Sequence, residues 1–243
     1  MADRRRFSPG VRILAAAGLV TAGIAVGLLL GSRGGSPAPS PTAGTAGVAP
    51  AASGPVAPDP GLPTLDFSDL TWMDFHGFAL PVSPTAGPHI LADDRASGFA
   101  HTPLGAALAA INIGFRTGSS VSPFVFEPTI AEQVTGVDQP ALVAQTRTDA
   151  ANEGVPARLM GRLPEPVFRF VGVRFDAVTP DRLVLYVATA AEDTTGTTVY
   201  AAGRADVRWE RGDWRVVAPP GGSWTTVTTR IASSAGFQLF PRR

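Results

Sequence analysis

The chain of 243 residues contains no cysteine, and all 20 of its Lys plus Arg residues are arginine. The absence of cysteine excludes a disulfide framework, a thiolate nucleophile and a cysteine-ligated zinc or iron–sulfur site. The absence of lysine excludes Schiff-base chemistry and a P-loop lysine. The G-x-S-x-G, G-x-G-x-x-G and H-E-x-x-H patterns are also missing. The sequence therefore offers no motif for a hydrolase, a nucleotide-binding protein or a zinc protease, and it implies no cofactor.

A long uncharged run is present near the N-terminus, where the 20 residues Ile13–Ser32 separate two arginines. A helix of that length spans about 30 Å, the thickness of the hydrocarbon core of a bilayer. The flank before it, residues 1–12, holds four arginines and one aspartate, a net charge of +3. By the positive-inside rule, residues 1–12 are expected in the cytoplasm, residues 13–32 in the membrane and the rest of the chain outside the cell membrane.

A cleaved signal peptide is the alternative interpretation of the same run. Such a peptide needs an A-x-A-like site after Leu30, but the chain continues Gly31-Ser32-Arg33-Gly34-Gly35. Without cysteine there is no lipoprotein route either. We therefore favour an uncleaved single-pass anchor, and both alternatives place the remaining chain outside the cytoplasm.

The composition then changes twice along the chain. Residues 33–63 are almost entirely Pro, Ala, Gly, Ser and Thr, which predicts a disordered tether with polyproline II character. Residues 64–243 are rich enough in apolar side chains for one globular domain. This domain holds 15 arginines against 18 carboxylates, so it lacks the basic stripe of a nucleic-acid-binding protein.

Within the domain, the first half predicts an extended arm and then helices. Residues 65–82 are aromatic-rich and are expected to form an extended arm packed on the domain. Thr102 and Pro103 are typical of a helix start, and apolar residues at i, i+4, i+7 and i+11 continue the helix until Gly118. A second helix is expected from Pro128 to Gly136, and a third from about Gln139 to Asn152.

The second half predicts strands, over residues 167–178, 183–190, 197–210 and 213–218. In the third strand, apolar residues alternate with the charged row Arg204, Asp206, Arg208 and Glu210, which suggests cross-strand ion pairs on a solvated face. Arg211-Gly212 predicts a tight turn, across which Trp209 and Trp214 could meet. The expected class is α+β, with helices on one face of a curved antiparallel sheet.

Two resemblances extend this interpretation. The runs Gly77-Phe78-Ala79-Leu80-Pro81-Val82-Ser83, Ala86-Gly87-Pro88 and 97–107 resemble uncharacterised actinobacterial membrane-anchored proteins of integrative and conjugative elements. The order of anchor, linker, helices and long strands, with Gly-Asp-Trp-Arg-Val-Val at 212–217, is more distantly similar to the nuclear transport factor 2 superfamily. That resemblance implies a cone-like domain, the fold that bitopic scaffold proteins of type IV secretion and conjugation machines use outside the membrane.

The expected function is therefore a non-enzymatic assembly scaffold of a conjugative DNA-transfer apparatus. Its partners would be the membrane, copies of itself and other envelope proteins, without direct binding of nucleic acid. The candidate partner contacts are three aromatic residues of the arm and two arginines of the charged row: Trp72, Phe75, Phe78, Arg204 and Arg208.

Three alternatives stay open. A cone-shaped pocket could bind a small apolar ligand. It could also house an enzyme that uses Tyr186 or Tyr200 as donor and Asp176 or Asp206 as base, although ion pairing of Asp206 is the simpler account. The three histidines, His76, His89 and His101, could converge on a metal with Asp74 or Asp93, but they lack regular ligand spacing and are more simply loop or cap residues.

Overall fold

The computed structural model describes residues 61–153, 168–193 and 196–243, so the predicted anchor and nearly all of the predicted linker lie outside the described residues. These residues form helices and both mixed and antiparallel sheets, and the predicted α+β class is confirmed. The three helices are α1 (Pro103–Arg116), α2 (Pro123–Gln133) and α3 (Gln139–Glu153). Among the described residues, none of these helices combines the length and apolarity needed to cross a membrane.

The main sheet has seven strands in the order β11-β6-β7-β8-β9-β5, with β10 paired to β8. Its pairs are antiparallel except β5–β9, which is parallel. The strands are β5 (Val134–Thr135), β6 (Phe168–Thr179), β7 (Arg182–Glu192), β8 (Thr198–Glu210), β9 (Asp213–Val217), β10 (Thr228–Ile231) and β11 (Gln238–Leu239). Two separate hairpins are formed by β1 (Thr71–Phe75) with β2 (Phe78–Val82) and by β3 (Ile90–Ala92) with β4 (Arg95–Ser97).

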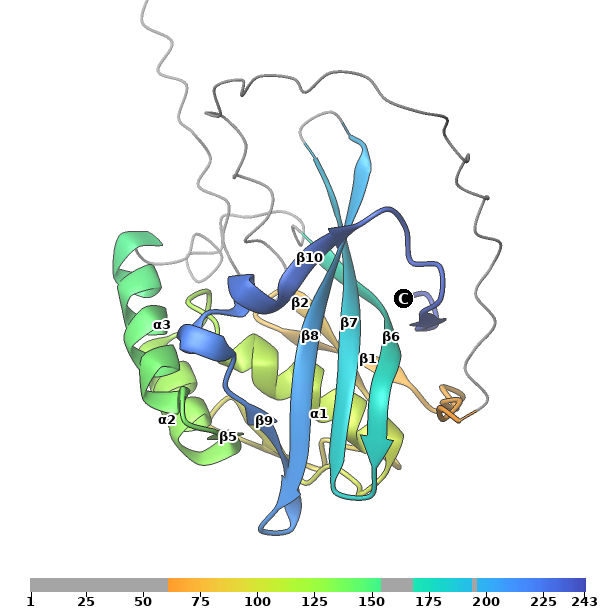
Figure 1. Cartoon of the computed structure of the whole chain (residues 1–243), viewed down its shortest axis with the longest axis horizontal. Helices are drawn as coiled ribbons and strands as arrows, with labels where there is room; N and C mark the ends of the chain where they lie inside the picture. The colour runs from red at the N-terminus through yellow and green to blue at the C-terminus, as the bar shows by residue number, and fades with distance from the viewer. Residues whose placement is uncertain (1–60, 154–167, 194–195) are drawn as a thin grey trace, which may run out of the picture.

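Helix α1 is the centre of the molecule. It passes behind strands β6 to β8 in Figure 1, and the view from above shows it between the main sheet and the β1–β2 hairpin. Twelve of its 14 residues are buried, since both sides of the helix are covered. The side chain of Thr102 caps the helix as predicted, accepting a hydrogen bond from the Gly105 N–H at 3.1 Å. Gly105 is required there, because a Cβ would lie 2.1 Å from the carbonyl oxygen of Ala100.

Two of the predicted elements need correction. The second helix begins at Pro123 behind the cap Ser122, and Pro128 lies inside it. Ser122-Pro123 carries the same cap-and-proline signature that marks α1, whereas the prediction chose the later proline. The predicted extended arm is the β1–β2 hairpin, whose turn residues His76 and Gly77 both have positive φ. Paired positive φ values are typical of the tight turns that close such hairpins.

The strand predictions agree well with the sheet. The turn at Arg211-Gly212 joins β8 to β9, and the rings of Trp209 and Trp214 meet edge to face across it, with centroids 5.4 Å apart. The helix α3 also begins at Gln139, as expected. The short strands β10 and β11 were not predicted, because segments of four and two residues carry too little alternation.

The first and last described segments of the chain are joined in a clasp, residues 63–72 with 238–241. The Leu65 N–H donates to Oε1 of Gln238 at 2.6 Å, and Nε2 of Gln238 donates to the carbonyl oxygen of Pro63 at 2.9 Å. The ring of Phe240 packs edge to face on Phe67 and Trp72. The start of the domain is thus fixed to strand β11, which itself pairs with β6.

Candidate contact face and pocket

The face of the main sheet that points away from α1 carries a row of arginines. Arg182 of β7 lies opposite Arg208 of β8, and Arg208 lies opposite Arg215 of β9. Directly opposed residues of antiparallel strands share a face and lie about 5 Å apart at Cβ. Among the described residues, no helix covers this face in either view. Three guanidinium groups therefore gather on one uncovered part of the sheet.

One carboxylate pairs with this row. Asp206 accepts hydrogen bonds from Nε and Nη2 of Arg182, the latter at 2.6 Å, and the contact raises the pKa of the Arg182 guanidinium. The carboxylate is 12% exposed and Arg182 is 52% exposed. The predicted cross-strand ion pairing of the charged row is thus confirmed for Asp206, whose partner Arg182 lies on the neighbouring strand. The Nε atoms of Arg208 and Arg215 are buried and have no hydrogen-bond partner among the described residues.

A second group of cations lies four residues away along β7 and β8. Tyr186 of β7 lies between Arg174 of β6 and Arg204 of β8 in the register. The Arg174 guanidinium carbon is 4.9 Å from the ring centre of Tyr186 and 5.1 Å from that of Phe237, so it contacts two aromatic rings. Cation–π contacts hold such a guanidinium in place without neutralising it.

We define the arginine face as Arg174, Arg182, Arg204, Arg208 and Arg215. The carboxylates near these arginines on the same side include Asp206, Glu210 and Asp213, the last two at the hairpin end. Asp213 is engaged elsewhere: its oxygens accept the backbone N–H groups of Gly98, Phe99 and Trp214. The arginine face is therefore positive on a domain that carries more carboxylates than arginines overall.

The five predicted partner contacts have different positions. Arg204 and Arg208 are half-buried on the arginine face. Trp72 is half-buried in the clasp, where its Nε1–H donates to the carbonyl oxygen of Pro241 at 3.3 Å. Phe75 and Phe78 are only 6% and 5% exposed and pack on Phe115 of α1. Those two rings are core residues, which corrects their interpretation as surface contacts.

The candidate acid–base and metal residues are spread over the molecule. His76 bonds Asp94, His89 bonds the carbonyl oxygen of Pro84, and His101 contacts Asp181 and stacks on Trp209. Within the described ranges, no three His, Asp or Glu side chains are placed to hold a metal ion. Tyr186 and Asp206 both lie on the arginine face, away from the interior around α1. The histidines fix turns rather than gather in one site.

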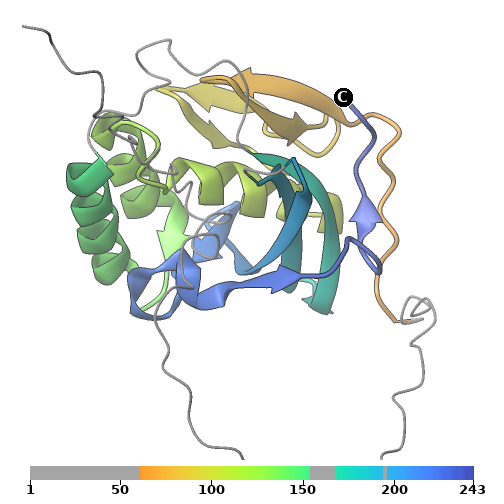
Figure 2. The same ribbon diagram turned by 90° about the horizontal axis from the view of Figure 1, so that it is seen from above.

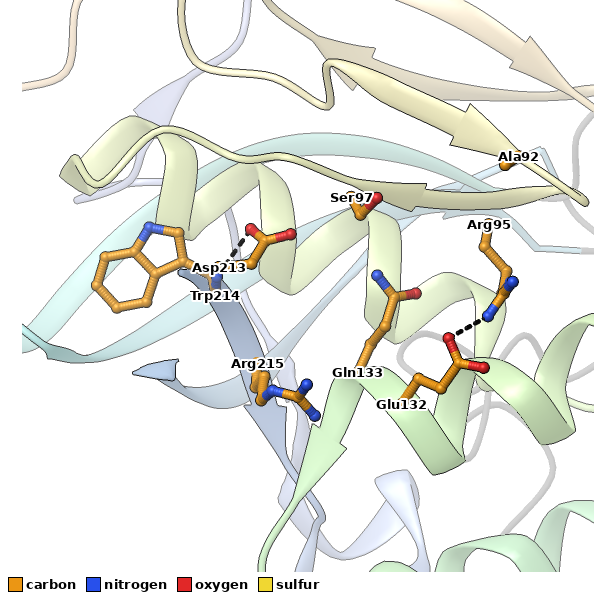
Figure 3. Close-up of a pocket in the computed structure, with 8 residues that line it drawn as sticks. All are labelled: Ala92, Arg95, Ser97, Glu132, Gln133, Asp213, Trp214 and Arg215. Atoms are coloured by element: carbon orange, nitrogen blue, oxygen red, sulfur yellow. Dashed lines mark hydrogen bonds and ion pairs between the residues drawn. The ribbon is translucent and has the colours of Figure 1, made fainter. Parts of the chain in front are cut away.

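A pocket of about 240 Å³ lies at the edge of the sheet beside the arginine face. Figure 3 shows its lining, which comes from β3 and β4, the last turn of α2 and the start of β9: Ala92, Arg95, Ser97, Glu132, Gln133, Asp213, Trp214 and Arg215. Arg95 forms an ion pair with Glu132 across it. The hydrogen bonds from Gly98 and Phe99 to Asp213 hold the end of β4 against β9 and thereby form one wall.

Sequence reasoning missed this pocket. Its residues come from segments more than 100 positions apart, and no spacing in the sequence links Arg95 to Arg215. One signal was available in the sequence. Arg215 lies among the apolar residues of the Gly-Asp-Trp-Arg-Val-Val run at 212–217, in the strand that follows the one carrying Arg208. The alternation of β8 and β9 across a two-residue turn would have placed these two arginines opposite each other.

The profile of a family described as a domain of unknown function, DUF8175, matches residues 34–239. No curated protein and no solved structure matches the chain. Because the family profile covers most of the chain, the chain belongs to the DUF8175 family.

Proposed function

We propose that this member of the DUF8175 family is a single-pass membrane protein whose extracytoplasmic domain acts, without enzymatic activity, as an assembly scaffold. Residues 13–32 form the uncleaved anchor, residues 1–12 stay in the cytoplasm, and residues 33–63 tether the domain outside. Its partners are copies of itself and other envelope proteins, and its setting is a conjugative DNA-transfer apparatus of the type IV secretion kind. The sequence supports each of these statements through its charge asymmetry, apolar run and resemblances.

The arginine face is the observation that carries the scaffold role. Arginine and tyrosine are enriched in protein interfaces, and arginine is among the residues that dominate their binding energy. Here five arginines share a sheet face with Tyr186, which lies between two of them, Arg174 and Arg204. Among the described residues, only Arg182 of these five forms an ion pair with a carboxylate. Such a face is complementary to an acidic protein surface. The excess of carboxylates over the whole domain argues against DNA as the partner.

The cone-like fold of the nuclear transport factor 2 superfamily belongs to the same proposal. A long sheet with β-bulges in β6 and a helix against its inner side is compatible with it. The interior is filled, however, by α1 residues such as Leu108, Ile111 and Phe115, all at most 2% exposed. A scaffold role therefore has more support than an apolar ligand pocket or a cone-fold enzyme, which are the alternatives.

The topology can be tested with protease on intact protoplasts. We expect a tag after Arg243 to be digested and a tag before Met1 to be spared, because the positive flank holds residues 1–12 inside. N-terminal sequencing of the mature protein checks the anchor. A mature chain that begins after Leu30 would show that a signal peptide had been removed and would refute the anchor.

Charge reversal tests the scaffold role. We expect the double substitution Arg204→Glu with Arg208→Glu to abolish conjugative transfer and the recovery of cross-linked partners, while the melting temperature stays almost unchanged. The fold should tolerate it because both side chains lie outside the core on a sheet face, and because a carboxylate at position 208 would lie between the opposite charges of Arg182 and Arg215.

The matched control is Arg147→Glu with Arg230→Glu. Both arginines are exposed and lie outside the arginine face, Arg147 on α3 and Arg230 on β10. This control changes the net charge by the same amount as the face variant. Cells that carry it should transfer DNA at the normal frequency. Normal transfer by the face variant, or by a deletion strain, would contradict the proposal.

A further inference from the structure

The pocket beside the arginine face contains polar atoms that have no partner. Among the described residues, six buried side-chain nitrogen or oxygen atoms lack a hydrogen bond, and three of them belong to residues that line this pocket: Arg95 Nε, Gln133 Oε1 and Arg215 Nε. A fourth, Arg208 Nε, belongs to the residue opposite Arg215. A buried polar atom without a partner costs about 1–3 kcal/mol. Their concentration around one cavity indicates that the cavity is where these atoms find their partners.

The two arginines that line the pocket differ in their ion pairing. Arg95 is neutralised by Glu132, with Asp93 at 3.6 Å. The carboxylate of Asp213 is occupied by three backbone N–H groups. Arg215 has no ion pair among the described residues and faces the like charge of Arg208. A guanidinium in this position matches a carboxylate, which it can bind through two parallel hydrogen bonds.

Gln133 supplies a hydrogen-bond acceptor beside these donors. Its Nε2 donates to the carbonyl oxygen of Ala96 at 2.6 Å, which fixes the amide so that Oε1 is the free acceptor. In Figure 3 the Gln133 side chain lies between those of Arg215 and Arg95. The free groups therefore follow the order donor, acceptor, donor: Arg215, Gln133 Oε1 and Arg95 Nε.

We propose that this pocket binds a carboxylate that follows an amide group, the chemistry of the last residue of a peptide. The carboxylate would bind Arg215, the amide N–H would donate to Gln133 Oε1, and the amide carbonyl would accept from Arg95 Nε. The volume of about 240 Å³ is below the about 300–1,000 Å³ typical of pockets for whole drug-sized ligands, which suits one terminal residue. This inference goes beyond the scaffold role and does not depend on it.

Titration of the purified full-length chain in detergent tests the proposal, with calorimetry and tryptophan fluorescence as readouts, since Trp214 lines the pocket. The probes are acetyl-Ala-Ala-Ala with a free carboxylate, the same peptide as its C-terminal amide, acetyl-alanine and sodium acetate. We expect the peptide acid to bind at least about tenfold more tightly than the peptide amide, because the amide leaves Arg215 without an anion. Acetate should bind weakest, since it lacks the N–H for Gln133.

Variants locate the site. Arg215→Gln should weaken binding of the peptide acid by about tenfold or more, so that the acid and the amide bind with similar affinity. Arg204→Gln is the matched control: it removes an arginine of the same face that does not line the pocket, so affinity should be unchanged. A thermal melt of each variant shows that the fold is kept, and Gln133→Met, which keeps Arg215, should selectively reduce the preference for acetyl-alanine over acetate.

The comparison of probes separates two sources of this chemistry. Tighter binding of the tripeptide than of acetyl-alanine supports a peptide C-terminus, and equal affinity supports a small N-acyl amino acid. Equal binding of acid and amide, equal loss in both arginine variants, or no binding of any probe at millimolar concentration would overturn the proposal.

Discussion

Replacing Leu108 with aspartate is expected to leave no folded domain. Leu108 lies in the middle of α1 and is completely buried, with the main sheet on one side and the β1–β2 hairpin on the other. Losing the packing of a buried leucine costs about 2–5 kcal/mol. A carboxyl group in the same place adds several kcal/mol, either as a desolvated charge or through the proton it must take up. The total is comparable to the about 5–15 kcal/mol that stabilises an ordinary domain.

Circular dichroism during thermal unfolding measures this effect. Leu108→Met is the matched control, because a volume-conserving apolar exchange usually costs less than about 1.5 kcal/mol and the cooperative transition should persist. A cooperative transition in the aspartate variant would mean that α1 is not the buried centre of the domain.

The second large effect is expected at Arg116, the last residue of α1, which is only 1% exposed. Its Nε donates to the carbonyl oxygen of Asp94 at 2.7 Å, and its Nη1 donates to the carbonyl oxygen and Oδ1 of Asn112. The guanidinium carbon lies 4.1 Å from the ring centre of Phe75. Burial lowers the pKa of Arg116 to about 10, with the charge of Asp94 opposing the shift, so the group is still a cation at neutral pH.

Arg116→Ala should therefore destabilise the domain by about 3–5 kcal/mol, since it creates a cavity and removes the donor of three side-chain hydrogen bonds. Arg116→Lys keeps the charge but not the planar guanidinium or its contact with Phe75. It should therefore lose less stability than the alanine variant. Arg116→Met should also lose less than alanine, because it fills the space and removes the cost of burying a charge.

Urea unfolding of the three variants checks this order. Equal stability of the alanine variant and the unsubstituted chain would show that the guanidinium does not join α1 to the two hairpins. If the lysine variant is as unstable as the alanine variant, the whole loss of stability comes from the planar guanidinium and its contact with Phe75 rather than from the charge.

The long strands and the first helix were predictable because each carries a repeated local signal. Alternation over β8 and the cap at Thr102 are set by neighbours in the sequence, and the structure keeps both. The β1–β2 hairpin was missed although His76-Gly77 marks its turn, because the aromatic residues on both strands, Phe75 and Phe78 among them, hide the alternation. Both rings became core residues, since the hairpin covers the far side of α1.

The candidate site could also be predicted only in part. Arg204 and Arg208 were found because one strand places them on one face. Their neighbours Arg174, Arg182 and Arg215 come from three other strands, so only the register of the sheet brings the group together. The pocket depends further on Asp213 holding Gly98 and Phe99, a contact between residues more than 100 positions apart that no local pattern encodes.

The clasp between residues 63–72 and 238–241 decides how the domain responds to mechanical load. A pull on the chain before Gly61 reaches the Gln238 hydrogen bonds and the ring contacts of Phe240 before any residue of α1. From there the force passes through β11 into β6, the next strand of the main sheet. We therefore expect the clasp to be the first element to open under tension, while β6 to β9, which carry the arginine face, stay paired.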